Sequence, residues 1–310
     1  KDLRLNVLKK AFTQLPWKNL EHLKHLPTGG HIKQILVVGI GGSSLGAKAL
    51  ITGVKCIFLD NIDPEFVEKT LKKINLKHTL ILLISKSGET VEILSLAKYL
   101  LSKTRSYKNF AVITDNPESS LGYLAKKHSI SIFISPKNVP GRFSVLSIVG
   151  LIPAHLADVQ TEKVLAGAKN VVWRDAYNLA QHQYVHFSKK KNITVIFPYA
   201  ENLGFFADWY IQLLAESIGK SKRIGITPIK AIGVKDQHSQ LQLFLDGPDD
   251  KFFIFIKPKN IDGDPALKRL FNAEYEGVKK AFIKRKKTFL EISFEKLTPE
   301  IFGALFYFFR

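Results

Sequence analysis

Two short segments combine glycines with hydroxyl side chains directly after runs of apolar residues: "GIGGSSLG" at 39–46 and "SKSGET" at 85–90. Glycine lets the backbone approach a ligand closely, and serine and threonine hydroxyls donate hydrogen bonds. The first segment lacks the Gly-Lys-Ser/Thr ending of the loop that binds nucleoside triphosphates. Because no set of metal ligands accompanies them, these hydroxyls favour the phosphate group of a small phosphate monoester.

Each segment offers both ligand donors and structural roles. In the first, Ser43 and Ser44 offer hydroxyl donors and a cap for the following helix. In the second, Lys86 adds a positive charge among three hydroxyl side chains. The structural alternative is that the first turn only packs a strand tightly against a helix, and that the second only caps a helix.

Short apolar runs alternate with helix-like stretches from residue 35 onward. The runs cover 35–40, 56–59, 80–85, 110–114 and 131–135, with helix-like stretches such as 64–73 and 89–102 between them. Strands that are apolar on both faces and alternate with helices predict a parallel sheet covered by helices. Ligands of such sheets bind beyond the carboxyl ends of the strands. Both segments follow strands there, so we expect them to lie close together.

Further apolar runs at 193–200 and 251–258 predict a second sheet after a strongly helical stretch. The predicted fold class is therefore α/β, with two doubly wound parallel sheets, each in an α/β/α sandwich. The predicted divisions are an N-terminal helical extension over 1–30, a first domain over 31–160 and a second domain over 161–310.

The composition is that of a globular protein with a large core, because 45% of the 310 residues are hydrophobic. No apolar run approaches the roughly 20 residues of a membrane span, and the first residues do not resemble a signal peptide. The single cysteine, Cys56, excludes an internal disulfide and is expected to be a packed core residue. We expect a cytoplasmic protein with no membrane partner.

The charge is strongly basic, with 46 Lys and Arg against 27 Asp and Glu and a formal net charge of +19. It is compatible with a nucleic-acid partner, an anionic substrate or a basic proteome. The densest basic run, 279–287, has Phe282 and Ile283 in its middle and is interpreted as a solvated helical face. No nucleic-acid-binding signature accompanies it, so we expect no nucleic-acid partner. Complex formation that persists at high salt would support the opposite hypothesis.

Five segments in this order resemble the glucose-6-phosphate isomerase family, which is built from two sugar-isomerase (SIS) domains. They are "GIGGSSLG", "SKSGET", "GRFSVLSIVG" at 141–150, "QLLAESIGK" at 212–220 and "DQHSQLQ" at 236–242. The resemblance extends from about residue 31 to the end of the chain. It implies interconversion of glucose 6-phosphate and fructose 6-phosphate, in a homodimer whose active sites are shared between subunits, without a metal or organic cofactor.

The resemblance also implies site residues. The substrate phosphate would be bound by Gly42, Ser43, Ser85, Lys86, Ser87 and Thr90. Arg142 would lie beside the reacting carbons, Glu216 would be the base, and His238 would assist ring opening in the neighbouring subunit. These residue types suit the chemistry, because one carboxylate can move a proton between two carbons while a permanently charged arginine stabilises the enediolate.

Each of these residues has a structural alternative. Glu216 falls in a four-residue repeat that would make it a solvated partner of Lys220. His238 could be an ordinary surface or core histidine, and Arg142 follows a Pro-Gly turn where an arginine without function is common. At the level of the whole protein, the alternative is a non-catalytic sugar-phosphate-binding regulator, which would need "SKSGET" but not Glu216 and His238 together.

Two departures from the family pattern stand out. Glu89 occupies a position where a threonine is common, and its charge would lie near the phosphate unless the side chain turns outward. The family's C-terminal tail carries a glutamine and a catalytic lysine that cannot be assigned in this chain. The chain also contains no methionine. We therefore expect the intact protein to be longer than the printed sequence and to contain methionine.

Overall fold

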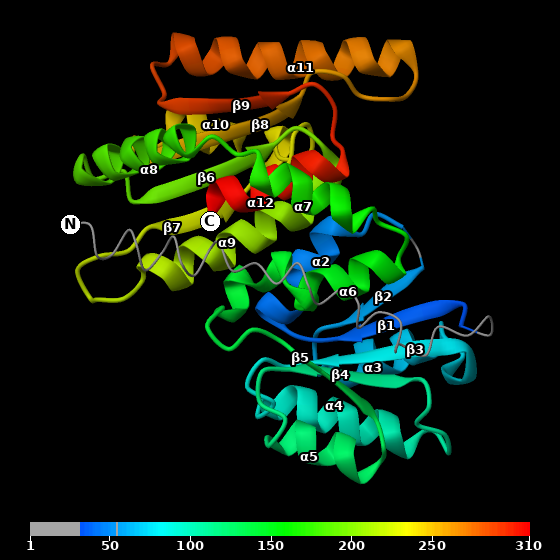
Figure 1. Cartoon of the computed structure of the whole chain (residues 1–310). Coiled ribbons are helices and arrows are strands. Elements are labelled where there is room, and N and C mark those ends of the chain that lie inside the picture. The colour runs from blue at the N-terminus through cyan, green and yellow to red at the C-terminus, as the bar shows by residue number, and fades with distance from the viewer. Residues whose placement is uncertain (1–31, 54) are drawn as a thin grey trace. The chain divides into compact units, whose positions relative to one another are not determined.

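The computed structural model describes residues 32–53 and 55–310, and the predicted helical extension over 1–30 lies outside this part of the chain. The chain divides into two compact units, Lys1–Thr161 and Glu162–Arg310. Each unit is built on one parallel sheet flanked by helices (Figure 1).

The sheet of the first unit has five parallel strands in the order β2-β1-β3-β4-β5. The strands are β1 (Gln34–Val38), β2 (Cys56–Leu59), β3 (Thr79–Ile84), β4 (Phe110–Thr114) and β5 (Ser131–Ile134). The chain moves from β1 to β2 on one side and then crosses to β3 on the other side. The carboxyl ends of β1 and β3 are therefore neighbours at the point where the strand order reverses, which is where doubly wound sheets bind ligands.

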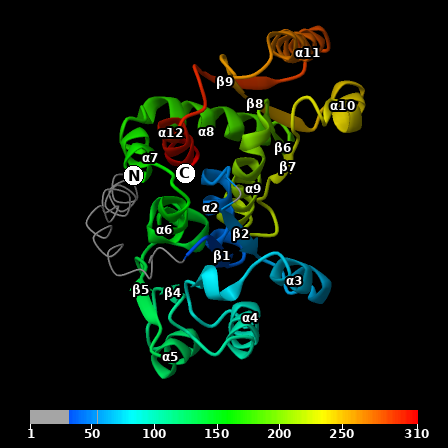
Figure 2. The ribbon, with the colours of Figure 1, turned by 90° about the vertical axis from the view of Figure 1, so that its right-hand side faces the viewer.

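Helices cover both faces of this sheet. They are α2 (Leu45–Leu50), α3 (Pro64–Leu71), α4 (Val91–Ser102), α5 (Ser120–Lys127) and α6 (Ile148–Leu156), with short 3₁₀ helices η2 (Gly41–Ser43), η3 (Leu76–His78) and η4 (Gly141–Leu146). Figures 1 and 2 show α3, α4 and α5 on one face and α2 and α6 on the other. Leu36 and Val38 of β1 pack into the core formed with α3, α4 and α5. The predicted three-layer α/β/α arrangement is confirmed for this unit.

The second unit contains four parallel strands in the order β7-β6-β8-β9. They are β6 (Ile193–Pro198), β7 (Thr227–Lys230), β8 (Lys251–Pro258) and β9 (Phe289–Phe294). This is the same topology as the β2-β1-β3-β4 part of the first sheet, with β6 in the place of β1. The apolar runs of the sequence predict β6 and β8, whereas β7 and β9 are half-exposed strands that those runs do not include.

The helices of the second unit also lie on both faces of its sheet. They are α7 (Thr161–Lys169), α8 (Trp173–Ser188), η5 (Glu201–Leu203), α9 (Gly204–Ile218), α10 (Gln237–Asp246), α11 (Pro265–Lys284) and α12 (Pro299–Phe309). Phe244 of α10 and Phe282 of α11 join the core on one face. Trp209 of α9 packs edge-on against Phe306 of α12, with ring centroids 4.7 Å apart. None of the described helices is long and apolar enough to cross a bilayer.

Candidate active site

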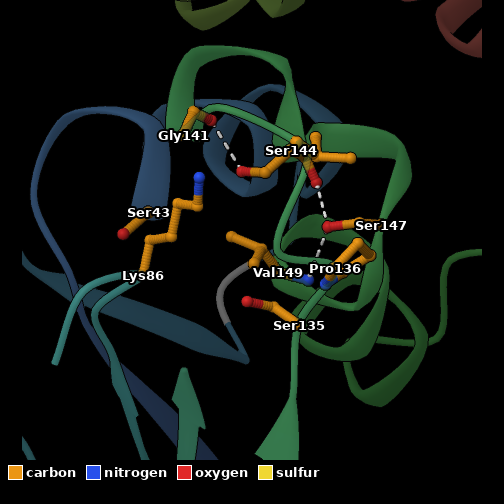
Figure 3. A pocket seen from close by; sticks show the side chains of 9 residues that line it. Ser43, Lys86, Ser135, Pro136, Gly141, Ser144, Ser147 and Val149 are labelled. Atoms are coloured by element: carbon orange, nitrogen blue, oxygen red, sulfur yellow. Dashed lines mark hydrogen bonds between the residues drawn. The ribbon is translucent and has the colours of Figure 1, made fainter. Parts of the chain in front are cut away.

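A pocket lies beyond the carboxyl ends of β1 and β3. Its lining consists of Ser43, Lys86, Ser135, Pro136, Val139, Gly141, Ser144, Ser147 and Val149. Figure 3 shows the ammonium end of Lys86 extending beside Ser43 toward the turn at Gly141. One positive charge among several hydroxyls is the composition expected of a phosphate site, and the two glycine and hydroxyl segments meet here as predicted.

Glycine is required where the first loop meets the turn that carries Arg142. A Cβ atom on Gly42 would lie 2.3 Å from the carbonyl carbon of Gly141 and 2.7 Å from the backbone nitrogen of Arg142. The hydroxyl of Ser144 ties the two backbones together, because it lies 2.6 Å from the Gly141 oxygen and 3.2 Å from the Gly42 oxygen. Gly41 has a φ of +57°, which is the left-handed region. The bare backbone therefore brings two predicted site residues, Gly42 and Arg142, into direct contact.

The two serines of the first loop have different roles. Ser44 is fully buried, and its hydroxyl donates to the Gly41 carbonyl at 3.3 Å. Ser44 occupies the N-cap position of α2, but its hydroxyl makes no capping hydrogen bond, so the expected side-chain cap is absent. Ser43 is partly exposed and lines the pocket. Of the two serines, only Ser43 lines the pocket.

The second loop is organised by Ser85. This residue is 2% exposed, and its hydroxyl lies 2.9 Å from that of Thr90 and accepts a hydrogen bond from the Gly88 backbone at 3.1 Å. Gly88 has a φ of +68°, and a Cβ there would lie 1.9 Å from the Ser119 hydroxyl. Ser85 thus shapes the loop from within, whereas Ser87 is exposed.

Asp115 at the end of β4 fixes the backbone of Lys86. The Lys86 carbonyl accepts hydrogen bonds from the Asp115 backbone nitrogen and the Thr114 hydroxyl, both at 2.9 Å. The Asp115 carboxylate lies 3.6 Å from the Lys86 ammonium. Sequence reasoning missed Asp115, although its place directly after an apolar run that ends on the same sheet edge was a usable signal.

The Glu89 side chain is directed to the start of α5. Its Oε1 accepts a hydrogen bond from the Ser120 backbone nitrogen at 2.7 Å. Hydrogen bonding to Ser120 lowers the pKa of the Glu89 carboxyl below its ordinary value. The carboxylate is therefore bound at a helix terminus, although Glu89 still lines a surface hollow together with Lys86 and Ser87.

Arg142 lies in η4, in the turn that contacts Gly42. Its guanidinium lies 4.8 Å from the centroid of the Phe143 ring. A planar guanidinium resting on an aromatic face keeps its charge and loses little mobility when it binds an anion. The predicted phosphate residues and Arg142 are thus brought together in the first unit.

Glu216 and His238 belong to the second unit. Glu216 is exposed near the end of α9, and its Oε1 accepts a hydrogen bond from Gln212 Nε2 at 2.8 Å. His238 is exposed in the first turn of α10. Sequence reasoning did not identify Gln212, one helical turn earlier, as the partner of Glu216.

Glu216 and His238 lie toward opposite ends of the strands of the second sheet. We call the side where the strands begin the amino edge and the side where they end the carboxyl edge. Asp208, early in α9, pairs with Lys230 at the carboxyl end of β7 at 2.6 Å. Glu216 lies eight residues further along the helix, about 12 Å toward the amino edge. His238 follows β7 at the carboxyl edge. Within this unit, therefore, Glu216 and His238 are about 12 Å or more apart.

Residues 32–53 and 55–310 contain no group of three His, Cys, Asp or Glu side chains arranged to hold a metal ion. Cys56 is buried, as predicted, and burial raises the pKa of its thiol to about 12.

Comparison with known proteins identifies the family of this chain. A model of the phosphoglucose isomerase family matches residues 22–247. The chain belongs to the phosphoglucose isomerase family. A glucose-6-phosphate isomerase of Campylobacter jejuni is 35% identical over 334 residues, covering 94% of this chain and 80% of the relative. One from Methanocaldococcus jannaschii is 39% identical over 259 residues, covering 78% and 63%.

Solved structures agree on the fold of this phosphoglucose isomerase family member. A hypothetical protein of Thermus thermophilus has a TM-score of 0.81 at 27% identity, with 99% of this chain and 88% of that one covered. A glucose-6-phosphate isomerase of Chlamydia trachomatis has a TM-score of 0.78 at 22% identity, with 97% and 67% covered. The part matched by the family model, residues 22–247, contains both glycine and hydroxyl loops, Arg142, Glu216 and His238.

Proposed function

We propose that this chain catalyses the reversible isomerisation of glucose 6-phosphate and fructose 6-phosphate, as an aldose–ketose isomerase of its family. The observation that carries the proposal is the pocket in which Lys86 and Ser43 meet beside the turn of Arg142. The Lys86 ammonium and the Ser43 hydroxyl can bind the phosphate of a sugar, and the neighbouring turn of Arg142 supplies a permanent positive charge for the sugar carbons. No observation favours a non-catalytic regulator.

The substrate phosphate is bound by Gly42, Ser43, Ser85, Lys86, Ser87 and Thr90 in this proposal. Ser43, Lys86, Ser87 and Thr90 contact the phosphate, and Ser85 holds the loop through its bond to Thr90. Each hydrogen bond to a charged group contributes about 1.5–3 kcal/mol, so a few of them bind a dianion firmly.

Proton transfer is assigned to Glu216. Its carboxylate removes the proton from C2 of glucose 6-phosphate or from C1 of fructose 6-phosphate and returns it to the neighbouring carbon. Arg142 stabilises the negative charge of the intermediate enediolate, because the guanidinium stays charged throughout. His238 moves a proton during opening of the pyranose ring. This route needs no metal or organic cofactor.

A homodimer with shared active sites is part of the proposal. Glu216 and His238 point to it because they lie toward opposite edges of their own sheet. A histidine that assists ring opening must reach the same sugar as the base. A second copy of the chain can supply His238 to a site whose Glu216 belongs to the first copy. We further propose that the enzyme works in the cytoplasm.

A coupled assay tests this function. Fructose 6-phosphate is supplied, and glucose 6-phosphate is detected through its oxidation by a dehydrogenase. Turnover that disappears in Glu216→Gln supports the proposal. Absence of turnover by the full-length protein, with sugar-phosphate binding retained, would support the regulator instead.

A further inference from the structure

The loops at the two edges of the second sheet differ sharply in charge. The loops that enter the strands are 189–192, 219–226, 247–250 and 285–288, and they carry nine basic and two acidic side chains. The loops that leave the strands are 199–203, 231–236, 259–264 and 295–298, and they carry three basic and five acidic side chains. A basic composition alone would not separate the charges in this way.

The strand order places the basic loops side by side. Because β7, β6, β8 and β9 are successive neighbours, their amino ends form a row about 14 Å long at the usual strand spacing. We call this row, with its four entering loops, the basic edge. Three of its loops supply three basic residues each.

The acidic residues of the basic edge already form ion pairs with buried lysines. Asp249 pairs with Lys191 at 2.7 Å and Asp250 pairs with Lys251 at 2.5 Å, and both lysines are buried. Six other basic residues are exposed and form no ion pair with the described acidic residues: Lys189, Lys190, Lys220, Lys222, Arg223 and Lys286. The edge therefore presents uncompensated positive charge to solvent.

A row of exposed aromatic rings leads away from this edge along α8. Trp173, Tyr177 and Tyr184 are 62%, 58% and 70% exposed, and their spacing of four and seven residues places them on one face of the helix. The opposite face packs on the sheet, where Gln183 bonds to Thr194 at 3.1 Å and His186 stacks on Phe252. We call these three rings the aromatic row.

We infer that the basic edge and the aromatic row together bind single-stranded nucleic acid. Lysine and arginine side chains would bind the phosphates, and the rings would stack with unpaired bases, which is how sequence-tolerant single-strand binding works. This goes beyond the isomerase activity and reverses the expectation from sequence, which rested on the absence of a known motif.

The geometry favours a flexible single-stranded nucleic acid over a flat anionic membrane as the ligand. α8 ends at Ser188, where the basic edge begins, and Trp173 lies 15 residues earlier, about 22 Å along the helix axis. A flat membrane laid across the basic edge, facing the end of α8, would not reach Trp173. A single-stranded nucleic acid can bend from the basic edge onto α8.

The test measures binding of the full-length protein to a fluorescein-labelled single-stranded RNA by fluorescence anisotropy over a range of salt concentrations. We compare Lys189→Glu/Lys190→Glu/Lys286→Glu with Lys72→Glu/Lys73→Glu/Lys77→Glu, which changes the charge equally at exposed positions of the first unit. The edge variant should lose affinity by about 100-fold or more and have a shallower salt dependence, while the control changes little. Equal losses in both variants would overturn the inference.

The aromatic row is tested separately, with Trp173→Ala/Tyr184→Ala. This variant should weaken RNA binding roughly tenfold or more with an unchanged salt slope, because stacking does not release counterions. Unchanged isomerase activity in these variants shows that they are folded. Three results would contradict the proposal: unchanged RNA affinity of the aromatic variant, tighter binding to anionic phospholipid vesicles than to RNA, or a change in oligomeric mass without a change in RNA affinity.

Discussion

Gln212 and Glu216 lie one turn apart on α9, and Gln212 Nε2 donates a hydrogen bond to Glu216 Oε1 over 2.8 Å. A carboxylate that takes a proton from carbon must hold one orientation toward the substrate. This hydrogen bond restrains one carboxylate oxygen of Glu216, so Gln212 acts through the base as a positioning residue.

Gln212→Leu should therefore lower kcat by about 10- to 100-fold with little change in KM, as expected for one lost bond to a charged group. Steady-state kinetics measure both constants. The control is Gln242→Leu on α10, because Gln242 makes the same contact with Asp246, four residues away, at 3.2 Å. An equal loss of kcat in both variants would show that Gln212 has no special role.

Gly42→Ala should disturb the site through backbone contact. The new Cβ would lie 2.3 Å from Gly141, and overpacking of this kind costs about 1–3 kcal/mol. We expect a lower free energy of unfolding and a raised KM, because the loop of Ser43 must move away from Arg142. Gly53→Ala is the matched control, since its Cβ would have no neighbour within 4 Å. The explanation fails if both variants behave like the parent in urea unfolding and kinetics.

Ser87→Ala/Thr90→Val should weaken substrate binding by about 2–4 kcal/mol, because two hydrogen bonds to a charged phosphate are lost. Competitive inhibition by inorganic phosphate should weaken in parallel. Ser102→Ala/Thr104→Val removes two hydroxyls that bond only to local backbone groups and serves as the control. Unchanged KM and unchanged phosphate inhibition in Ser87→Ala/Thr90→Val would contradict the assignment of these two residues to phosphate binding.

Asp236 should make folding stability depend on pH. Its burial works to raise the carboxyl pKa, but hydrogen bonds from the Ile232 backbone and from Ser239 outweigh burial, so the pKa is lowered. A lowered folded-state pKa gives stability that is complete above the ordinary aspartate pKa, near 4, and is lost as the pH falls through the folded value. Asp236→Asn should be less stable than the parent at neutral pH.

That difference should shrink in acid, which urea unfolding across a pH series measures. Asp175→Asn, an exposed carboxylate on α8, controls for the loss of one negative charge. A stability difference between Asp236→Asn and the parent that stays constant down to strongly acidic pH would contradict the role given to Asp236.

Local patterns predict much of this fold, because buried parallel strands are continuous apolar runs. β2, β4 and β8 begin and end where the sequence indicates. β7 is a four-residue edge strand with Pro228 inside it, and β9 includes the charged Glu291, so neither is a continuous apolar run. Their pairing partners decide their structure.

The site was predictable only in part, for a similar reason. Glycines beside hydroxyls indicate a phosphate loop, but they do not show that Ser44 turns inward while Ser43 lines the pocket. The link between Lys86 and Asp115 joins the ends of β3 and β4, and only the folded sheet brings them together. The basic edge likewise arises from strand order and not from any one charge run.

The central claim is that Glu216 transfers the substrate proton, and exchange of that proton with solvent tests it most directly. The parent and Glu216→Gln are incubated with glucose 6-phosphate in deuterium oxide, and deuterium at C2 is followed by NMR. The amide keeps the shape but accepts no proton, so exchange and turnover should fall together by about 10²–10⁴-fold while sugar-phosphate binding persists. Exchange in Glu216→Gln within a few-fold of the parent would contradict the mechanism.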